Sequence, residues 1–416
     1  MAGLSIAASL DRAKLARLAD GLLVAVAVSL PWSTSATGIL TVLWLLALIP
    51  TLDWAEVRRE LLTPAGGLPV LLFLLGVAGM AWADVAWLAR WKGLDAFLKL
   101  LVIPLLFAQF RRSDRGLLVF GGYAGAGVAL LLLSSTFVQW PGLAFLAGHD
   151  LGVPVKNAAT QSGEFVTCIF GFLFLALESL RRRQWLWSLG LLLLILGMLG
   201  NIFYVATGRT ALAIIPVLLV LFAVKKLDYR GMFFLFTGAI LLGALAWYSS
   251  PHLRDRTMEL WSNVQRYEAT DERNSAGERI EFAKKSLEFV QEAPILGHGT
   301  GSIHALFEKS ALGEAGAAGS ATTNPHNQTF AVAIQLGVVG ALVLWAMWIA
   351  HLLLFRGDGL VEWIGLVVVV QNVVGSLFNS HLFDFTQGWV YVVGVGVAGG
   401  MALKQRAAKG SSGAAP

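Results

Sequence analysis

Three side chains of the kinds that bind anions or move protons stand close to the starts of three predicted helices. Arg209 opens a long apolar run, Arg279 follows the start of an amphipathic helix in the largest polar segment, and His326 opens another apolar run. A cation at a helix N-terminus works against the helix dipole, at a cost of ~0.3–1 kcal/mol. Because helix N-termini already attract anions, two arginines placed in this way predict that an anion binds between them.

The types of these residues indicate which chemistry they would serve. The guanidinium fork of arginine pairs bidentately with phosphate, and histidine is the usual general base near neutral pH. The set predicts a phosphate or pyrophosphate leaving group and a base for an incoming hydroxyl. Each residue alone also has an ordinary explanation: Arg209 as a membrane-boundary anchor, Arg279 on a solvated helix face, and His326 as a partner for a backbone group.

The composition predicts an all-α integral membrane protein. The 416 residues are 56% hydrophobic and 14% charged, with a mean hydropathy of +0.69, whereas a soluble domain carries roughly 25% charge. Apolar runs of about 20 residues recur along the chain, as membrane-spanning helices require. We predict about twelve spans, at residues 18–31, 36–50, 68–84, 93–110, 117–139, 163–180, 185–206, 208–226, 231–249, 326–355, 360–379 and 385–403.

The distribution of basic residues predicts the orientation of the chain. One alternating set of loops holds 18 of the 31 lysines and arginines, which marks that set as cytoplasmic. Both termini are then cytoplasmic, and residues 250–325 form one large outer loop between spans one to nine (1–249) and the last three spans (326–403). Residues 404–416 are predicted to be a disordered cytoplasmic tail. The pI near 9.4 thus reflects orientation signals, and no nucleic-acid partner is expected.

Local signals predict how the outer loop is built. Ser275 and Glu278 form a capping-box pattern ahead of an amphipathic helix that Pro294 ends. The following Gly297-x-Gly299-x-Gly301 pattern predicts a turn. Pro325, after Asn324, is typical of the first position of a helix, which would put His326 in the first turn and at the same outer face as Arg209 and Arg279.

Other polar residues in the outer loops are candidates for the same cavity. His298 and His304 are interpreted as structural, because they lie in and just after a glycine-rich turn. No cluster has the spacing of metal ligands and Cys168 is the single cysteine, so we expect neither a metal nor a cofactor. The possible cavity-lining residues are Lys156, Asn327, His381 and Asp384.

Taken in order, these motifs resemble the O-antigen ligase/polymerase superfamily over roughly residues 195–350. The resemblance rests on Gly208-Arg209-Thr210, the helix from Arg279 to Pro294, Gly297-x-Gly299-x-Gly301, Pro325-His326-Asn327 and the following Gly337-Val338-Val339-Gly340. It implies an inner-membrane protein of glycosyltransferase type C architecture that moves a glycan from undecaprenyl pyrophosphate to an acceptor, without a metal, on the periplasmic side. Two positions depart from the family: Gly208 often is Ser, and an acidic residue often stands near Gln335.

Within the superfamily we expect an O-antigen ligase that joins O-antigen to lipid A–core oligosaccharide at the periplasmic face of the bacterial inner membrane. The resemblance then assigns His326 as the base and Arg209 and Arg279 to the pyrophosphate. An O-antigen polymerase is an alternative, although polymerases tend to have a second large periplasmic loop and residues 140–163 are modest. A protein O-oligosaccharyltransferase and a lipid-linked sugar transporter or flippase are further alternatives. Transporters usually place ionisable residues near the midplane, whereas the candidates here lie at one face.

Overall fold

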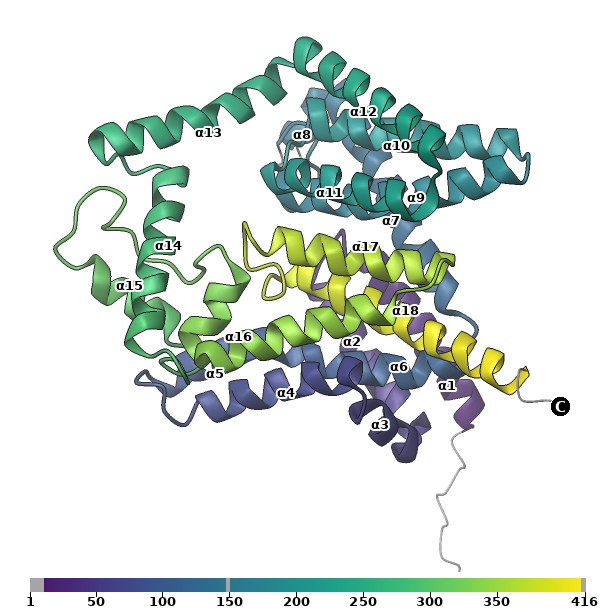
Figure 1. Ribbon diagram of the computed structural model, residues 1–416, viewed down its shortest axis with the longest axis horizontal. Coiled ribbons are helices and arrows are strands. Elements are labelled where there is room, and N and C mark those ends of the chain that lie inside the picture. Colours follow the sequence, from purple (N-terminus) through teal and green to yellow (C-terminus); the bar gives the residue numbers. More distant parts are fainter. Residues whose placement is uncertain (1–10, 147–149, 413–416) are drawn as a thin grey trace, which may run out of the picture.

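The chain is folded into helices throughout the part that the computed structural model describes, residues 11–146 and 150–412, and that part contains no strand. Figure 1 shows one group of helices, α9 to α12, above a second group that contains α1 to α6 and α16 to α18. Helices α13, α14 and α15 connect the two groups at one end, on the left of the view. The first nine elements are α1 (Arg12–Ser29), α2 (Thr34–Leu48), η1 (Ile49–Thr51), α3 (Trp54–Leu61), α4 (Pro64–Gly79), α5 (Trp87–Leu98), η2 (Lys99–Leu101), α6 (Val102–Arg112) and α7 (Gly116–Gln139).

The second half of the chain contains the longest helices. The predicted outer-loop segment, 250–325, holds α13 to α15. The remaining elements are α8 (Pro141–Leu146), α9 (Ala158–Arg181), α10 (Trp185–Tyr204), α11 (Arg209–Lys226), α12 (Tyr229–Ser249), α13 (Pro251–Thr270), α14 (Ser275–Glu292), α15 (Ile303–Ala311), α16 (Gln328–Leu354), α17 (Leu360–Gly375) and α18 (Phe385–Ser412).

Eight of the described helical segments are long and apolar enough to cross a membrane, or up to nine if the bent pair α3 and α4, at 84°, counts as one span. The all-helical membrane class predicted from the composition is therefore confirmed. Every predicted span overlaps a helix, but α1 and α11 are not among these candidates and α17 is a shorter apolar helix. The count of twelve spans stays a prediction.

Helix α18 extends beyond the last predicted span. It continues to Ser412, so residues 404–412, which the sequence analysis assigned to a disordered tail, are helical. The stretch from Met401 to Ala408 contains mainly strong helix formers, and Lys404 and Arg406 bond the backbone of Arg112 and Leu354. The last four residues of the predicted tail, 413–416, lie outside the described residues.

Helix α16 is broken at Gly337, and the glycine-rich turn fits into the break. Gly337 has φ 63° and ψ −163°, which is not helical. The carbonyls of Ile334 and Gln335 accept hydrogen bonds from the amides of His298 (2.8 Å) and Gly299 (2.9 Å) instead of from the next turn of the helix. Gly297, Gly299 and Gly301 all have positive φ, as the predicted turn requires.

The same turn packs tightly against α5. A Cβ atom on Gly93 would lie 2.5 Å from the Cα of Gly301, so the two backbones touch directly. Thr300 donates through its hydroxyl to the carbonyl of Gly76 (2.6 Å) and through its amide to that of Gly79 (3.0 Å) at the end of α4. The turn is therefore fixed by α4, α5 and α16 together.

A small hydrophobic core holds the outer helices on the first half of α16. Phe282 and Phe289 of α14 pack against Phe307 of α15. The other buried members of the cluster are Ile303 of α15 and Ala331 and Ile334 of α16. This core joins α14 to the first half of α16, and the glycine-rich turn joins the segment after α14 to the break in the same helix.

The capping box predicted at the start of α14 is wrong. Asn274 is the N-cap, and its Oδ1 accepts from the amides of Ala276 (3.1 Å) and Gly277 (3.0 Å). Ser275 is instead the first helical residue. Glu278 does not cap the helix; it pairs with Arg273 and accepts from the hydroxyl of Ser320. An asparagine one residue earlier takes over the capping role, since asparagine is as good an N-cap as serine.

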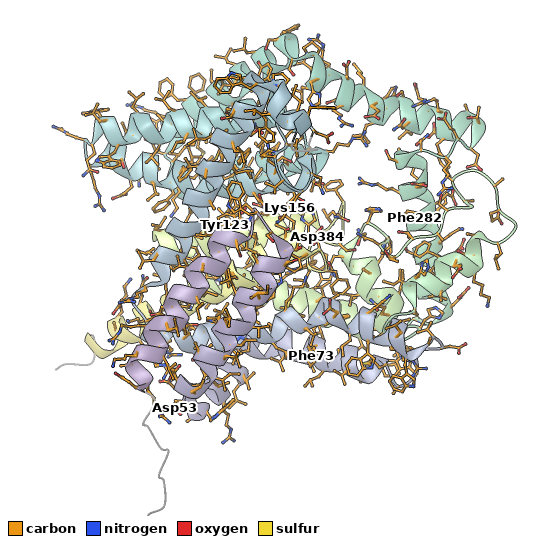
Figure 2. All side chains as sticks on the ribbon, turned by 180° about the vertical axis from the view of Figure 1, so that it is seen from behind. Asp53, Phe73, Tyr123, Lys156, Phe282 and Asp384 are labelled. Atoms are coloured by element: carbon orange, nitrogen blue, oxygen red, sulfur yellow. The ribbon has the colours of Figure 1, made fainter. Side chains whose placement is uncertain are left out.

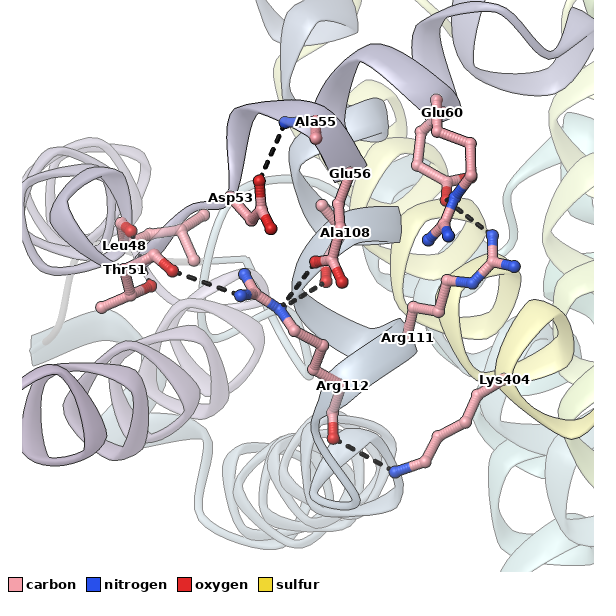
Figure 3. A network of polar contacts seen from close by, with 11 residues as sticks. Leu48, Thr51, Asp53, Ala55, Glu56, Glu60, Ala108, Arg111, Arg112 and Lys404 are labelled. Atoms are coloured by element: carbon pink, nitrogen blue, oxygen red, sulfur yellow. Dashed lines mark hydrogen bonds and ion pairs between the residues drawn. The ribbon is translucent and has the colours of Figure 1, made fainter. Parts of the chain in front are cut away.

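Charged residues at the opposite end of the molecule from α13 to α15 form a structural network (Figure 3). Arg111 donates to Glu60 Oε1 at 2.6 Å, and Arg112 Nε lies 3.1 Å from Glu56 Oε2. Lys404 of α18 donates to the carbonyl of Arg112 at 3.1 Å. Because the Glu60 side chain is fully buried, its ion pair with Arg111 offsets a large desolvation penalty. Basic residues predicted as orientation signals therefore also join α3, α6 and α18.

The predicted orientation is tested by single cysteines. Cys168 is buried, so the wild-type protein should give little background reaction with a thiol reagent. We expect Thr270→Cys, at the end of α13, to react in whole cells with a reagent that enters the periplasm but not the cytoplasm. Gln184→Cys and Tyr229→Cys should react only after the inner membrane is opened. Labelling of the last two variants in intact cells, without labelling of the first, would reverse the orientation.

Candidate active site

His326 lies just before α16 and not in its first turn. The amide of His326 donates to Asn324 Oδ1 (2.9 Å), which makes a tight turn around Pro325, and His326 takes φ 57°. Asn327 is the actual N-cap, and its Oδ1 accepts from the amide of Phe330 (3.2 Å). The expected first-turn position is thus wrong, because Asn324 bonds locally and leaves the capping role to Asn327.

Hydrogen bonds fix which nitrogen of His326 is free. Nδ1 lies 3.1 Å from Asn379 Oδ1, and the same oxygen accepts from Asn324 Nδ2 at 2.7 Å. An oxygen that already accepts from an amide is an acceptor, so His326 Nδ1 carries the hydrogen. Nε2 then holds the lone pair, the form that a general base needs. The ring also stacks on Phe282, with centroids 6.1 Å apart and an interplanar angle of 18°; Figure 2 shows Phe282 on α14.

The surroundings of His326 favour the neutral imidazole. Burial, and then the positive charge of Arg279, lower its pKa below the ordinary value, while the bond to Asn379 and the charge of Glu278 act in the opposite direction. The net shift of the pKa is downward, which favours the neutral ring. The cause is not a helix N-terminus, since His326 lies outside the helix; it is desolvation together with a neighbouring cation.

Arg209 is the first residue of α11 and is held by the outer helices. Its Nη2 lies 2.9 Å from Glu259 Oε2 on α13, and its Nη1 donates to Ser275 Oγ at 3.2 Å. The preceding Gly208 has no room for a side chain, because a Cβ would lie 2.0 Å from Ser162 Oγ. This contact explains glycine at a position where the family often has serine.

Arg279 is the fifth residue of α14, one residue further into the helix than the sequence predicted, because Asn274 and not Ser275 is the N-cap. The Arg279 side chain is exposed but partly surrounded by protein. This partial desolvation, and then the charge of Arg209, lower its pKa. Among the described residues, Arg279 has no hydrogen-bond or ion-pair partner. The positive charges of Arg209 and Arg279 therefore repel each other. Glu259 pairs with Arg209, and no carboxylate among the described residues pairs with Arg279. This excess of positive charge is what an anion site requires.

The structure thus brings Arg209, Arg279 and His326 into one region, as the sequence analysis expected. Arg209 donates to Ser275 at the start of α14, and the ring of His326 stacks on Phe282, which follows Arg279 in the same helix. Asn379, Glu259 and Phe282 were not assigned to the site from the sequence. No sequence pattern near Asn379 indicates its role, because its partner His326 is 53 residues away in the chain.

Three of the four possible cavity-lining residues have structural roles instead. Asn327 caps α16. Lys156 donates to the carbonyl of Leu30 and to Thr386 Oγ1 (2.8 Å), and its Nζ lies 3.7 Å from the buried Glu164. His381 is buried, and its ring fills the space left by the missing side chain of Gly375. These residues stabilise the helix junctions around the site.

Asp384 does line a cavity, although the cavity lies beside His326 and not around it. The volume is about 720 Å³, and the wall includes Asn324 and Pro325, which precede His326. One carboxylate oxygen of Asp384 accepts from the amide of Thr386 at 3.0 Å. Figure 2 shows Asp384 close to Lys156 at the centre of the molecule. His304, interpreted as structural, also lines this cavity, whereas His298 is structural and bonds the carbonyl of Phe289 at 2.8 Å.

The described residues contain no group of three or more His, Cys, Asp or Glu side chains that could hold a metal ion. Metal-independent chemistry stays a prediction that needs an assay. The positive charge available in the region comes from Arg209 and Arg279.

Residues 196–345 match the family model described as O-antigen ligase. The matched segment contains Arg209, Arg279 and His326, and it supports a function of the O-antigen ligase or polymerase type in a membrane protein. No curated protein matches the chain.

The charge of Arg279 should be measurable at His326. We expect an NMR titration of ring-labelled histidine to give His326 a pKa below the ordinary 6.5. Arg279→Gln should raise that pKa, because it removes a repelling cation, and Glu278→Gln should lower it further. Arg256→Gln on the exposed side of α13 is the control. The resonance is identified by its loss in His326→Gln. A pKa that Arg279→Gln leaves unchanged would contradict the proposed proximity.

Proposed function

We propose that this chain, a member of the O-antigen ligase superfamily, is an O-antigen ligase that transfers glycan from undecaprenyl pyrophosphate to lipid A–core oligosaccharide. The proposal rests mainly on one observation. A neutral histidine, with Nε2 free, lies within the electrostatic influence of an arginine that has no partner among the described residues. Such a transfer needs a base that removes the proton of the acceptor hydroxyl and a cation that stabilises the departing phosphate.

The proposed reaction is a single displacement at the anomeric carbon. The acceptor hydroxyl oxygen attacks this carbon as its bond to the pyrophosphate oxygen breaks, which inverts the configuration. The hydroxyl proton moves to His326 Nε2, and undecaprenyl pyrophosphate leaves with the electron pair of the broken bond. Arg209 and Arg279 stabilise the negative charge that grows on the pyrophosphate. No metal has a part in this scheme.

Asn379 supports this chemistry by holding the ring of His326. Its Oδ1 accepts from Nδ1 at 3.1 Å, which keeps Nε2 available before the reaction. The same bond stabilises the imidazolium after the proton arrives, because an amide oxygen is a better partner for a charged donor than for a neutral one. Asn379 is therefore a positioning residue.

Arg209 must exchange partners when the donor binds. In the present structure Glu259 Oε2 lies 2.9 Å from Arg209 Nη2 and 3.4 Å from Arg256 Nη1. Glu259 thus stands where a phosphate oxygen would compete for the same guanidinium. Since Arg256 remains as a partner for Glu259, release of Arg209 does not leave that carboxylate unpaired.

The proposed location is the bacterial inner membrane, with the site on the periplasmic side and both termini in the cytoplasm. The preference for a ligase over a polymerase rests on the modest segment between α7 and α9. The described part of that segment holds only the six-residue α8. A polymerase would use the same site with a second lipid-linked glycan as acceptor.

His326 is tested in a transfer assay with purified protein, lipid-linked O-antigen and lipid A–core acceptor. His326→Gln keeps a hydrogen-bonding group but cannot accept the proton at neutral pH. We expect its turnover to fall by ~10²–10⁴-fold, the contribution of a positioned base, with donor binding mostly retained. His252→Gln on α13 is the matched control and should keep wild-type turnover. Substantial turnover by His326→Gln would move the base elsewhere, with Asp384 the first residue to examine.

Arg279 is tested for its charge and for its planar shape. We expect Arg279→Ala to reduce turnover by ~10²–10³-fold, by analogy with the loss of one donor to a developing oxyanion. Arg279→Lys should rescue only part of this loss, because an ammonium cannot bind phosphate bidentately. Arg182→Lys, at an exposed arginine that pairs with Glu178 away from the site, is the control and should be neutral. Wild-type activity should survive EDTA, and a strict need for added Mg²⁺ or Mn²⁺ would contradict the role given to the arginines.

A further inference from the structure

We infer that the cavity between α5, α15 and residues 380–384, called the α5–α15 cavity below, binds an anionic sugar of the acceptor, and that Lys92 contacts its charged group. The inference rests on the proposed function, since it names the acceptor side of the same site. The cavity holds about 720 Å³, which is within the range of small-molecule sites. Its wall is formed by Ala86, Leu88, Ala89, Lys92, Gly93, Ala96, Gly301, Ile303, His304, Thr323, Asn324, Pro325, Ala331, Gln335, Ser380, Phe383 and Asp384.

The position of the cavity suits an acceptor and not the donor. Asn324 and Pro325 form part of its wall and lead directly into His326. Neither Arg209 nor Arg279 lines it. A ligand in the α5–α15 cavity would therefore lie beside the segment that carries the base, while the pyrophosphate takes the arginines of α11 and α14.

The polar side chains of the cavity wall differ in their partners. One oxygen of Asp384 accepts from the amides of Thr386 (3.0 Å) and Gln387 (3.4 Å), and Thr323 is exposed. The side chains of Asn324, Gln335 and Ser380 form hydrogen bonds with other protein groups. In the part of the chain that the structure describes, Lys92 and His304 have no hydrogen-bond or ion-pair partner, and both are exposed. Unpaired polar groups that converge on a hollow are the usual mark of a ligand site.

Close backbone packing and hydrogen bonds hold two walls of the cavity in place. Gly93 and Gly301 let α5 touch the glycine-rich turn, since a Cβ on Gly93 would lie 2.5 Å from Gly301 Cα. On the other side, the buried Lys99 donates to the carbonyls of Phe383 (3.2 Å) and Asp384 (2.8 Å) and holds residues 380–384 in place. The backbone that carries Lys92 is therefore held in place by contacts within the protein.

The chemistry of the wall indicates the class of ligand. Leu88, Ile303 and Phe383 offer apolar surface to the C–H face of a sugar ring, and Asp384 accepts hydrogen bonds from sugar hydroxyls. Lys92 supplies a positive charge and His304 a ring nitrogen for an acidic substituent. The ligand is therefore a sugar that carries a phosphate or a carboxylate group.

The test measures binding separately from turnover. Full-length protein in nanodiscs is titrated with rough lipopolysaccharide, used as the acceptor probe, before and after phosphate removal with aqueous hydrogen fluoride. We expect Lys92→Gln to weaken binding about tenfold, the loss of one charge-assisted contact, while binding of undecaprenyl pyrophosphate is unchanged. Lys309→Gln, on the same outer helix as His304 but not in the wall, is the matched control and should bind like the wild type.

Phosphate removal distinguishes the two acidic groups that Lys92 could bind. If phosphate removal abolishes the difference between wild type and Lys92→Gln, the group at Lys92 is a phosphate; if the difference persists, it is a carboxylate. Equal binding by wild type, Lys92→Gln and Lys309→Gln overturns the inference even if the protein is an active ligase. Turnover measured in parallel tests the proposed function independently. A wild type that binds the probe with the expected Lys92 dependence but transfers no glycan would refute the ligase assignment alone.

Discussion

The break in α16 at Gly337 is the constraint on which the geometry of the site depends. Breaking a helix frees backbone carbonyls, and buried carbonyls must find donors. The turn from Gly297 to Gly301 supplies them, with bonds of 2.8 and 2.9 Å from His298 and Gly299. The end of α14 is thereby anchored to the first half of α16. The glycine-rich turn at 297–301 and the break at Gly337 are therefore the two sides of one interface.

That anchor determines the electrostatics of the candidate site. It brings Arg279 of α14 close enough to His326, at the entrance of α16, for the cation to lower the pKa of the ring. The same cation is available to bind the donor, so binding and base strength are linked. If pyrophosphate binds Arg209 and Arg279 as proposed, we expect it to neutralise their charge and raise the pKa of His326, which would favour acceptance of a proton while the substrate is in place.

The sequence predicted the class of fold and the convergence of Arg209, Arg279 and His326, because hydropathy and charged loops control how helices insert. It did not predict the exact place of His326. Asn324 and Asn327 are both good caps. Asn324 bonds the amide of His326 locally, and its long-range bonds to Asn379 and Ser380 hold it in that place, which leaves the cap to Asn327. Long-range partners of this kind, like the contact of Lys156 with Leu30 and Thr386, leave no periodic signal in a sequence.

The central claim is that the two arginines bind the pyrophosphate of the donor beside a neutral His326. The most direct measurement is a cryo-electron microscopy structure of the protein in nanodiscs with undecaprenyl pyrophosphate. We expect density for both phosphates between Arg209 and Arg279, with Glu259 released from Arg209 and retained by Arg256. Pyrophosphate density at another place, such as beside Lys92 in the α5–α15 cavity, with the bond between Arg209 and Glu259 intact, would contradict it.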